Sequence, residues 1–192
     1  MKRLTLYYPI KPWFVAQGFG QNLVPLYKEL GMKGHNGLDL PGPDGRPIYA
    51  SHDGQVVFAG EDGSAGSGVV IRTIEPYSYA DGMSYFKTIY WHLKPNIPIK
   101  AGTLVKAGDL IGYCDTTGTA TGPHLHFGLK PVYQGEREWD WANTEQNNGY
   151  HGAIDPIPYL TGGYYAQDLP LVLGIMRALV EALKKLISIL KI

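Results

Sequence analysis

The chain has a single cysteine, Cys114, among its 192 residues. One thiol cannot form an intramolecular disulfide, so the sequence excludes a disulfide-stabilised fold. Cys114 ends the hydrophobic stretch that begins at Leu110, a setting typical of a buried small side chain rather than of a metal ligand.

An excess of charge of either sign is also lacking. Lysine and arginine together number 17, as do aspartate and glutamate, so the formal net charge is zero. The sequence therefore gives no indication of a nucleic-acid partner. Charge is nevertheless unevenly placed: residues 169–192 hold four cationic side chains against one glutamate, a local net charge of +3.

No run of about 18 apolar residues occurs, so no conventional transmembrane helix is expected. At the N-terminus, Lys2 and Arg3 precede a short apolar stretch that is broken by Pro9 and lacks a small-residue cleavage site. We therefore predict no signal peptide.

Short β-favouring segments separated by glycine and proline fill the chain before Asp168, and none has a sustained helical period. Residues 46–60 alternate around Asp53-Gly54, which predicts a hairpin, and residues 102–113 repeat their rhythm. With 44% hydrophobic residues, the chain can form one core plus an appendage. We predict an all-β fold, a two-sheet β-sandwich over residues 1–165.

Residues 166–192 have a different pattern. Asp168 can cap a helix with Pro170 in its first turn. Apolar residues then recur at alternating spacings of four and three, at Val172, Met176, Leu179, Leu183, Leu186 and Leu190. This predicts an amphipathic C-terminal helix with a basic opposite face. Residues 169–192 could self-associate, contact an anionic membrane surface, or pack on their own domain.

Thr121 to Phe127 reads Thr-Gly-Pro-His-Leu-His-Phe. In a strand, His124 and His126 point to the same side while the alternating apolar residues face the core. Upstream, His35 and Asp39 lie four residues apart around Asn36-Gly37, which allows the backbone to bend.

Brought together, His35, Asp39 and His126 would supply two imidazoles and one carboxylate and leave a fourth position open. This is the composition of a catalytic zinc site. The same donors also form the facial triad of non-haem iron oxygenases, the alternative metal class.

Three motifs in this order, His35-x-x-x-Asp39, Tyr90-x-His92-Leu93 and Thr121-Gly-Pro-His124-Leu-His126-Phe127, resemble the LytM/lysostaphin-type zinc endopeptidases of peptidase family M23. The resemblance extends from about Val15 to Leu160. It implies a sandwich of the duplicated hybrid motif type with one Zn²⁺ per chain.

The resemblance further implies that His35, Asp39 and His126 bind the metal. It gives His124 the role of general base, while His92 orients the water or stabilises the oxyanion; these two roles could be exchanged. One departure is Gly128, which stands where the family usually has an acidic residue.

By the same resemblance, the substrate is a peptide stem or bridge of bacterial peptidoglycan, and the protein acts at the bacterial cell wall. Without a signal peptide, it would arrive by phage delivery as an endolysin, by lysis from within, or by non-classical export. The alternative is a non-catalytic wall-binding or virion structural module that keeps the metal site.

Three further features of the sequence also lead to structural expectations. His52 lies beside the Asp53-Gly54 turn and is expected to be solvated rather than a ligand. Leu23 to Met32 could form one helical turn or a loop, and Tyr27 is expected in a surface loop, with lining of the cleft as the alternative. Residues 131–152 are expected to form a long irregular loop, either a wall of the substrate groove or a loop held in place by its own tryptophans.

Overall fold

A computed structural model describes residues 2–23, 25–135 and 141–165. The predicted C-terminal helix, together with its membrane and self-association alternatives, falls outside the described residues. Among the residues described, no helix has the length and apolar character needed to cross a membrane.

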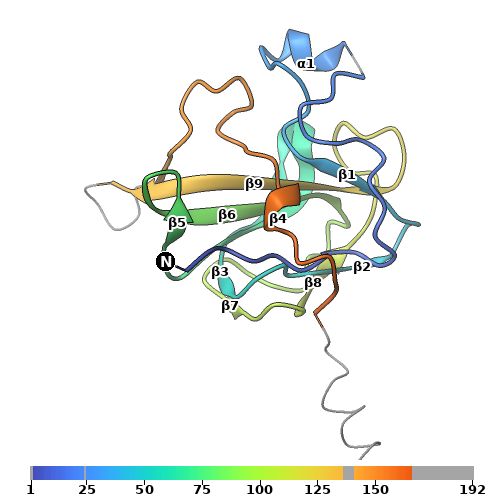
Figure 1. Cartoon of the computed structure of the whole chain (residues 1–192). Helices are drawn as coiled ribbons and strands as arrows, with labels where there is room; N and C mark the ends of the chain where they lie inside the picture. The colour runs from blue at the N-terminus through green and yellow to red at the C-terminus, as the bar shows by residue number, and fades with distance from the viewer. Residues whose placement is uncertain (1, 24, 136–140, 166–192) are drawn as a thin grey trace, which may run out of the picture.

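The regular structure of the described chain consists mainly of ten strands (Figure 1). Eight form one antiparallel sheet in the order β1-β9-β6-β4-β3-β7, with β10 paired to β9 and β5 paired to β6. Their bounds are β1 Leu38–Pro41, β3 Gly54–Asp62, β4 Gly66–Arg72, β5 Tyr77–Tyr79, β6 Gly82–Leu93, β7 Leu104–Val105, β9 His124–Gln134 and β10 Trp141–Asn143. The remaining elements are the paired strands β2 Pro47–Tyr49 and β8 Leu110–Tyr113, the short helix α1 Leu26–Glu29 and the 3₁₀ turns Gly63–Ala65 and Ile157–Tyr159.

The two long central strands alternate between faces, as period-2 sequences should. On β6, Phe86, Thr88 and Tyr90 are fully buried, whereas the residues between them are only partly buried. On β9, Leu125, Phe127 and Leu129 face the same core. One face of the sheet is thus the hydrophobic face, and the other carries polar side chains.

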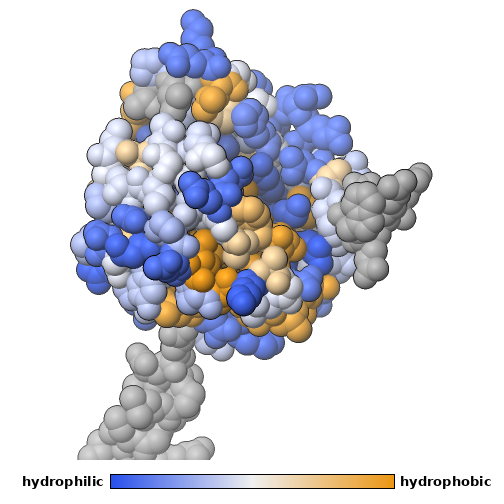
Figure 2. Space-filling view, turned by 180° about the vertical axis from the view of Figure 1, so that it is seen from behind, coloured by the Kyte–Doolittle hydropathy of each residue, from blue (hydrophilic) through white to orange (hydrophobic). Residues whose placement is uncertain are grey.

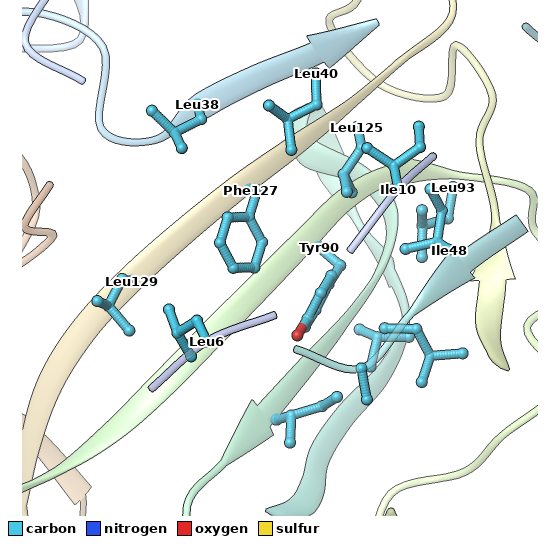
Figure 3. Packing of buried hydrophobic residues seen from close by; sticks show 14 of the residues in the cluster. Leu6, Ile10, Leu38, Leu40, Ile48, Tyr90, Leu93, Leu125, Phe127 and Leu129 are labelled. Atoms are coloured by element: carbon cyan, nitrogen blue, oxygen red, sulfur yellow. The ribbon is translucent and has the colours of Figure 1, made fainter. Parts of the chain in front are cut away.

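The N-terminal segment covers the hydrophobic face. Leu6 and Ile10 belong to the buried cluster and lie over Phe127, Tyr90 and the neighbouring core side chains (Figure 3). Leu6 also pairs with Leu160 in an isolated bridge. In Figure 1 this segment and the 3₁₀ turn at Ile157–Tyr159 lie in front of β9 and β6, so the view from behind in Figure 2 shows the opposite, outer face of the sheet.

The all-β prediction is confirmed. The second sheet contains only β2 and β8, so the predicted two-sheet sandwich stays an interpretation. The predicted hairpin over residues 46–60 is wrong, because β2 pairs with β8 whereas β3 pairs with β4 and β7. The turn serves a long-range contact instead: the Asp53 carboxylate accepts hydrogen bonds from the Ala107 amide at 2.9 Å and from Lys106.

Candidate metal centre

The pairing of β1 with β9 places two of the predicted ligands side by side. Asp39 lies directly opposite His126 in the register. Their strand neighbours Leu38, Leu40 and Leu125 are fully buried in the core, so the alternation turns Asp39 and His126 to the outer face.

His35 reaches the same place from the loop before β1. Its backbone is held by hydrogen bonds from the His35 amide to the Gln21 carbonyl and from the Gly20 amide to the His35 carbonyl, both 2.8 Å. Gly37 then passes against the metal centre: a Cβ atom at this position would lie 2.8 Å from the His126 ring and 2.7 Å from the Phe127 carbonyl. Only glycine fits there, which explains the bend between His35 and Asp39.

Three donor atoms converge. His35 Nε2 lies 3.1 Å from Asp39 Oδ1 and 2.9 Å from His126 Nδ1, and His126 Nδ1 lies 3.2 Å from the same carboxylate oxygen. Tetrahedral zinc ligands at about 2.0–2.1 Å from the ion are about 3.3 Å apart. The spacing and the chemistry of the two imidazoles and one carboxylate therefore fit a single zinc ion.

Charge is concentrated on Asp39. Burial alone would raise the pKa of the Asp39 carboxyl, but hydrogen bonds from His126 and His35 lower it well below its usual range. Burial lowers the pKa of His126, although Asp39 opposes that shift. The centre therefore holds a carboxylate with neutral imidazole beside it at neutral pH, the protonation state that a metal requires.

His124 stands next to this cluster with a defined tautomer. Its Nδ1–H donates to the Gly122 carbonyl at 2.8 Å, because a carbonyl oxygen can only accept. The other ring nitrogen, Nε2, lies 3.6 Å from Asp39 Oδ1. This nitrogen therefore stands beside the ligand group.

His92 reaches the outer face through an irregularity in β6. Its neighbour Trp91 already faces outward, so regular alternation would turn His92 into the core. The β4–β6 register instead shifts between Ser67 and Val69, and His92 has a left-handed φ of 64°. Such bulges and backbone outliers are frequent at functional sites because they re-aim a side chain.

The Thr117 loop fixes the His92 ring. His92 Nδ1–H donates to the Thr117 carbonyl at 2.7 Å, and the Thr117 hydroxyl donates to the Leu93 carbonyl at 2.8 Å. The ring centroids of His92 and His124 are 4.7 Å apart. Burial lowers the pKa of His92 to about 4, so the imidazole is neutral near pH 7.

Tyr27 is a site neighbour that sequence reasoning placed in a surface loop, and that prediction is wrong. Its side chain is only 8% exposed, and its ring centroid lies 5.6 Å from that of His35. Gln17 Nε2 donates to its hydroxyl at 2.8 Å. Burial and the nearby Asp39 charge raise the pKa of Tyr27 to about 12, so it stays a phenol.

His52 lies apart from the metal-ligand group, but the expectation that it is solvated is wrong. It is 4% exposed, and its Nε2 lies 2.9 Å from the Thr88 hydroxyl within the core. The expected irregular loop 131–152 is wrong in part, because β9 continues to Gln134 and β10 pairs with it. Cys114 is fully buried, as predicted.

The antiparallel sheet carries a partly buried cluster of two imidazoles and one carboxylate, a donor set found in metal-dependent hydrolases. The model of peptidase family M23 matches residues 33–140, more than half of the chain. The chain therefore belongs to peptidase family M23.

Relatives that are named for their activities share this domain. The chain is 37% identical over 131 residues to the peptidoglycan DD-endopeptidase ShyA of Vibrio cholerae, covering 67% of the chain and 28% of the relative. It is 33% identical over 154 residues to the glycyl-glycine endopeptidase ALE-1 of Staphylococcus capitis, covering 79% of the chain and 35% of the relative. The chain thus spans about a third or less of these relatives.

A solved structure agrees with the fold. A zinc-containing peptidase from Vibrio cholerae superposes with a TM-score of 0.54 at 28% identity, covering 77% of the chain and 41% of that structure. The family prediction made from the three motifs is therefore confirmed.

Proposed function

We propose that the chain is a zinc-dependent endopeptidase that hydrolyses peptides of bacterial peptidoglycan. One observation carries the proposal: beside the ligand group His35, Asp39 and His126 stand two further histidines whose rings are each held by a hydrogen bond from Nδ1–H to a backbone carbonyl. Membership in the family and the activities for which ShyA and ALE-1 are named support the substrate class.

His35, Asp39 and His126 would hold the ion. Bound there, zinc would supply a Lewis acid and lower the pKa of a water molecule toward 7. His124 Nε2, beside the ligand group, takes the proton from the attacking water and returns it to the leaving amine.

His92 acts from the adjacent position. Its Nδ1–H is bonded to the Thr117 carbonyl, and its Nε2 orients the water or stabilises the oxyanion. Tyr27, a phenol beside His35, can donate to the oxygen on which negative charge develops. These two residues position the reacting groups, whereas His124 moves the proton.

The experiment is digestion of purified sacculi by the zinc-loaded full chain, followed by mass spectrometry of the products. Wild type should release cleaved peptides, whereas His124→Ala should lose about 10²–10⁴-fold in rate and still bind zinc. His151→Ala, which changes an exposed histidine outside the site, is the matched control. Equal digestion by wild type and His124→Ala, or none by wild type, would contradict the proposal.

The remaining predictions concern the parts outside the site. The sandwich description, the domain boundary near residue 165 and the amphipathic helix over 166–192 belong to this proposal, as does delivery by a phage or by lysis. Deleting residues 169–192 should leave hydrolysis of soluble peptides intact and change oligomer size or liposome binding. If neither changes, the segment packs on its own domain.

A further inference from the structure

The outer face of the sheet continues beyond the metal centre as a groove. Trp91 lies directly opposite the ligand His126 in the β6–β9 register and lines this groove. The groove encloses about 780 Å³ over β3, β4, β6, β9 and β10. Figure 2 shows that on this side of the molecule hydrophobic surface is bordered by strongly hydrophilic surface. The groove is thus large enough for several residues of an extended peptide.

Three cations lie in a row across its floor. Arg72 on β4 is directly opposite Lys87 on β6, and Lys87 is directly opposite Lys130 on β9. All three line the groove. Like charges placed directly opposite each other on neighbouring strands destabilise a sheet. This arrangement therefore requires an anion to offset it.

Asp62 is the one carboxylate among the described residues that line the groove, and it forms no ion pair with Arg72, Lys87 or Lys130. Lys87 and Lys130 form no ion pair or hydrogen bond there. Arg72 donates to the Gln55 side-chain oxygen at 3.1 Å and lies 3.9 Å over the Trp141 ring, and neither contact neutralises its charge. Burial, followed by the charge of the neighbouring cation, lowers the pKa of Lys87 and of Lys130. The three charges are thus close, partly buried and uncompensated.

The surroundings suit a peptide. Phe58 and Trp91 form an edge-to-face pair along one wall, with ring centroids 5.5 Å apart. Gly128 lies on the outer face of β9 between His126 and Lys130, where the Ile89 side chain and the Asn36 carbonyl pack close to it. Lys130 is four residues from His126, about 13 Å along the strand. An extended peptide cut at the metal centre would place a residue about four positions away over the cations.

We infer that the groove formed around Arg72, Lys87 and Lys130 binds a carboxylate of the peptide substrate, so that this peptidase prefers an acidic stem peptide to an uncharged glycine bridge. The inference rests on the proposed function, because it takes the cut bond to lie at the metal centre. It assigns the choice of substrate to a surface that holds none of the proposed catalytic residues.

The first test is kinetic. The zinc-loaded full chain is given two peptides of one sequence, with the side-chain carboxylate about four residues from the cut bond either free or amidated, and with this residue on each side of the bond in turn. Wild type should cleave the free acid with a kcat/KM about tenfold higher, the effect of one charge-assisted contact. The double variant Lys87→Gln/Lys130→Gln should remove this ratio by lowering kcat/KM for the free acid to that for the amidated peptide.

A charge-matched control separates the groove from net charge. Lys94→Gln/Lys106→Gln also removes two cations, both from exposed ion pairs with Asp44 and Asp53 on other parts of the surface. This variant should keep the tenfold ratio. Loss of the ratio in both variants would overturn the inference, because general attraction would then explain it.

The second test measures binding without cleavage. By calorimetry, the zinc-loaded His124→Ala chain should bind the free acid more tightly than the amidated peptide, and adding Lys87→Gln/Lys130→Gln should abolish the difference. Equal affinities would overturn the inference even if wild type hydrolyses both peptides. A preference in binding with no hydrolysis by wild type would sustain it and contradict the proposed function instead.

Two rival occupants are tested in the same assay. Residues 136–140, outside the described part of the chain, include Glu136, Glu138 and Asp140. Neutralising all three should leave the peptide preference unchanged, and its disappearance would overturn the inference. Short polyphosphate should bind no more tightly than the acidic peptide. If it binds more tightly, and binds less tightly to the lysine double variant, the groove is a phosphate site and the peptide assignment is wrong.

Discussion

The two ends of the outer face differ in whether their charged side chains have partners. At the metal centre, the Asp39 carboxylate is surrounded by imidazoles that hydrogen-bond to it. At the other end, Lys87 and Lys130 face each other with no carboxylate partner among the residues described. The two ends share β9, and the two proposals assign bond cleavage to one end and substrate recognition to the other. Changes at either end should affect one property and leave the other.

Loss of a metal ligand should have the largest effect at the metal end. His126→Ala removes one of three donors, and the lost charge stabilisation is worth several kcal/mol, or about 10³-fold in kcat/KM. Zinc content measured by atomic absorption should fall with activity. Binding of the acidic peptide in the groove should persist, and its disappearance would show that the two ends are not separable.

A substitution on the core face of β9 should have the next largest effect. Phe127→Ala, one residue from His126, empties a fully buried position against Tyr90 and should lower the free energy of unfolding by about 3–5 kcal/mol. Denaturant unfolding of the zinc-free protein measures this. His126→Ala under the same conditions should cost clearly less, and equal losses would mean that the metal centre is part of the structural core.

The pH dependence of the unfolding free energy distinguishes the buried His52 from the histidines of the metal centre. Burial lowers the pKa of His52 to about 4, below its value of about 6.5 in the unfolded chain, so the unfolded state binds more protons between these values. The contribution of neutral His52 to stability is therefore complete above about pH 6.5 and is lost as the pH falls toward 4, about 2 kcal/mol of it between pH 7 and pH 5.

The measurement is the unfolding free energy of zinc-free protein at both pH values. His52→Gln should lose about that much less stability on acidification than wild type, whereas His151→Gln, at an exposed position, should behave as wild type. Identical pH dependence in wild type and His52→Gln would show that His52 is not the group responsible.

Tyr90→Phe should have the smallest effect. The Ser51 amide donates to the buried Tyr90 hydroxyl at 2.9 Å, and removal of that oxygen leaves the amide without an acceptor. We expect a loss of about 1–2 kcal/mol in unfolding free energy. Activity should not change, since Tyr90 lies on the core face of β6 whereas the site lies on the outer face. A loss of activity greater than the loss of stability would link the two faces.

The sequence predicted that this part of the chain forms strands. It also predicted that His124 and His126 lie on the same face of the sheet, because side chains alternate along β9. The bend around Gly37 was also predictable, since His35 and Asp39 cannot otherwise share one ion. Strand partners were not: Asp53-Gly54 resembles a hairpin turn, yet its carboxylate binds the Ala107 amide, 54 residues away in sequence. Local pattern does not encode such pairing.

Other features of the site depend on tertiary context. Regular alternation would have turned His92 into the core, and only the bulge opposite Gly68 aims it outward. His52 resembled a solvated turn residue because its burial comes from β6, which supplies Thr88. The row formed by Arg72, Lys87 and Lys130 could not be predicted from the sequence, whose net charge is zero. These residues are adjacent only through strand pairing.

The most direct test of the central claim is X-ray absorption spectroscopy at the zinc edge, on full-length protein loaded with one equivalent of zinc. We predict two histidine nitrogens and at least two oxygens at about 2.0–2.1 Å, one oxygen from Asp39 and one from solvent, with one nitrogen lost in His126→Ala. A closed shell of four protein ligands, or a spectrum unchanged by His126→Ala, would contradict the account.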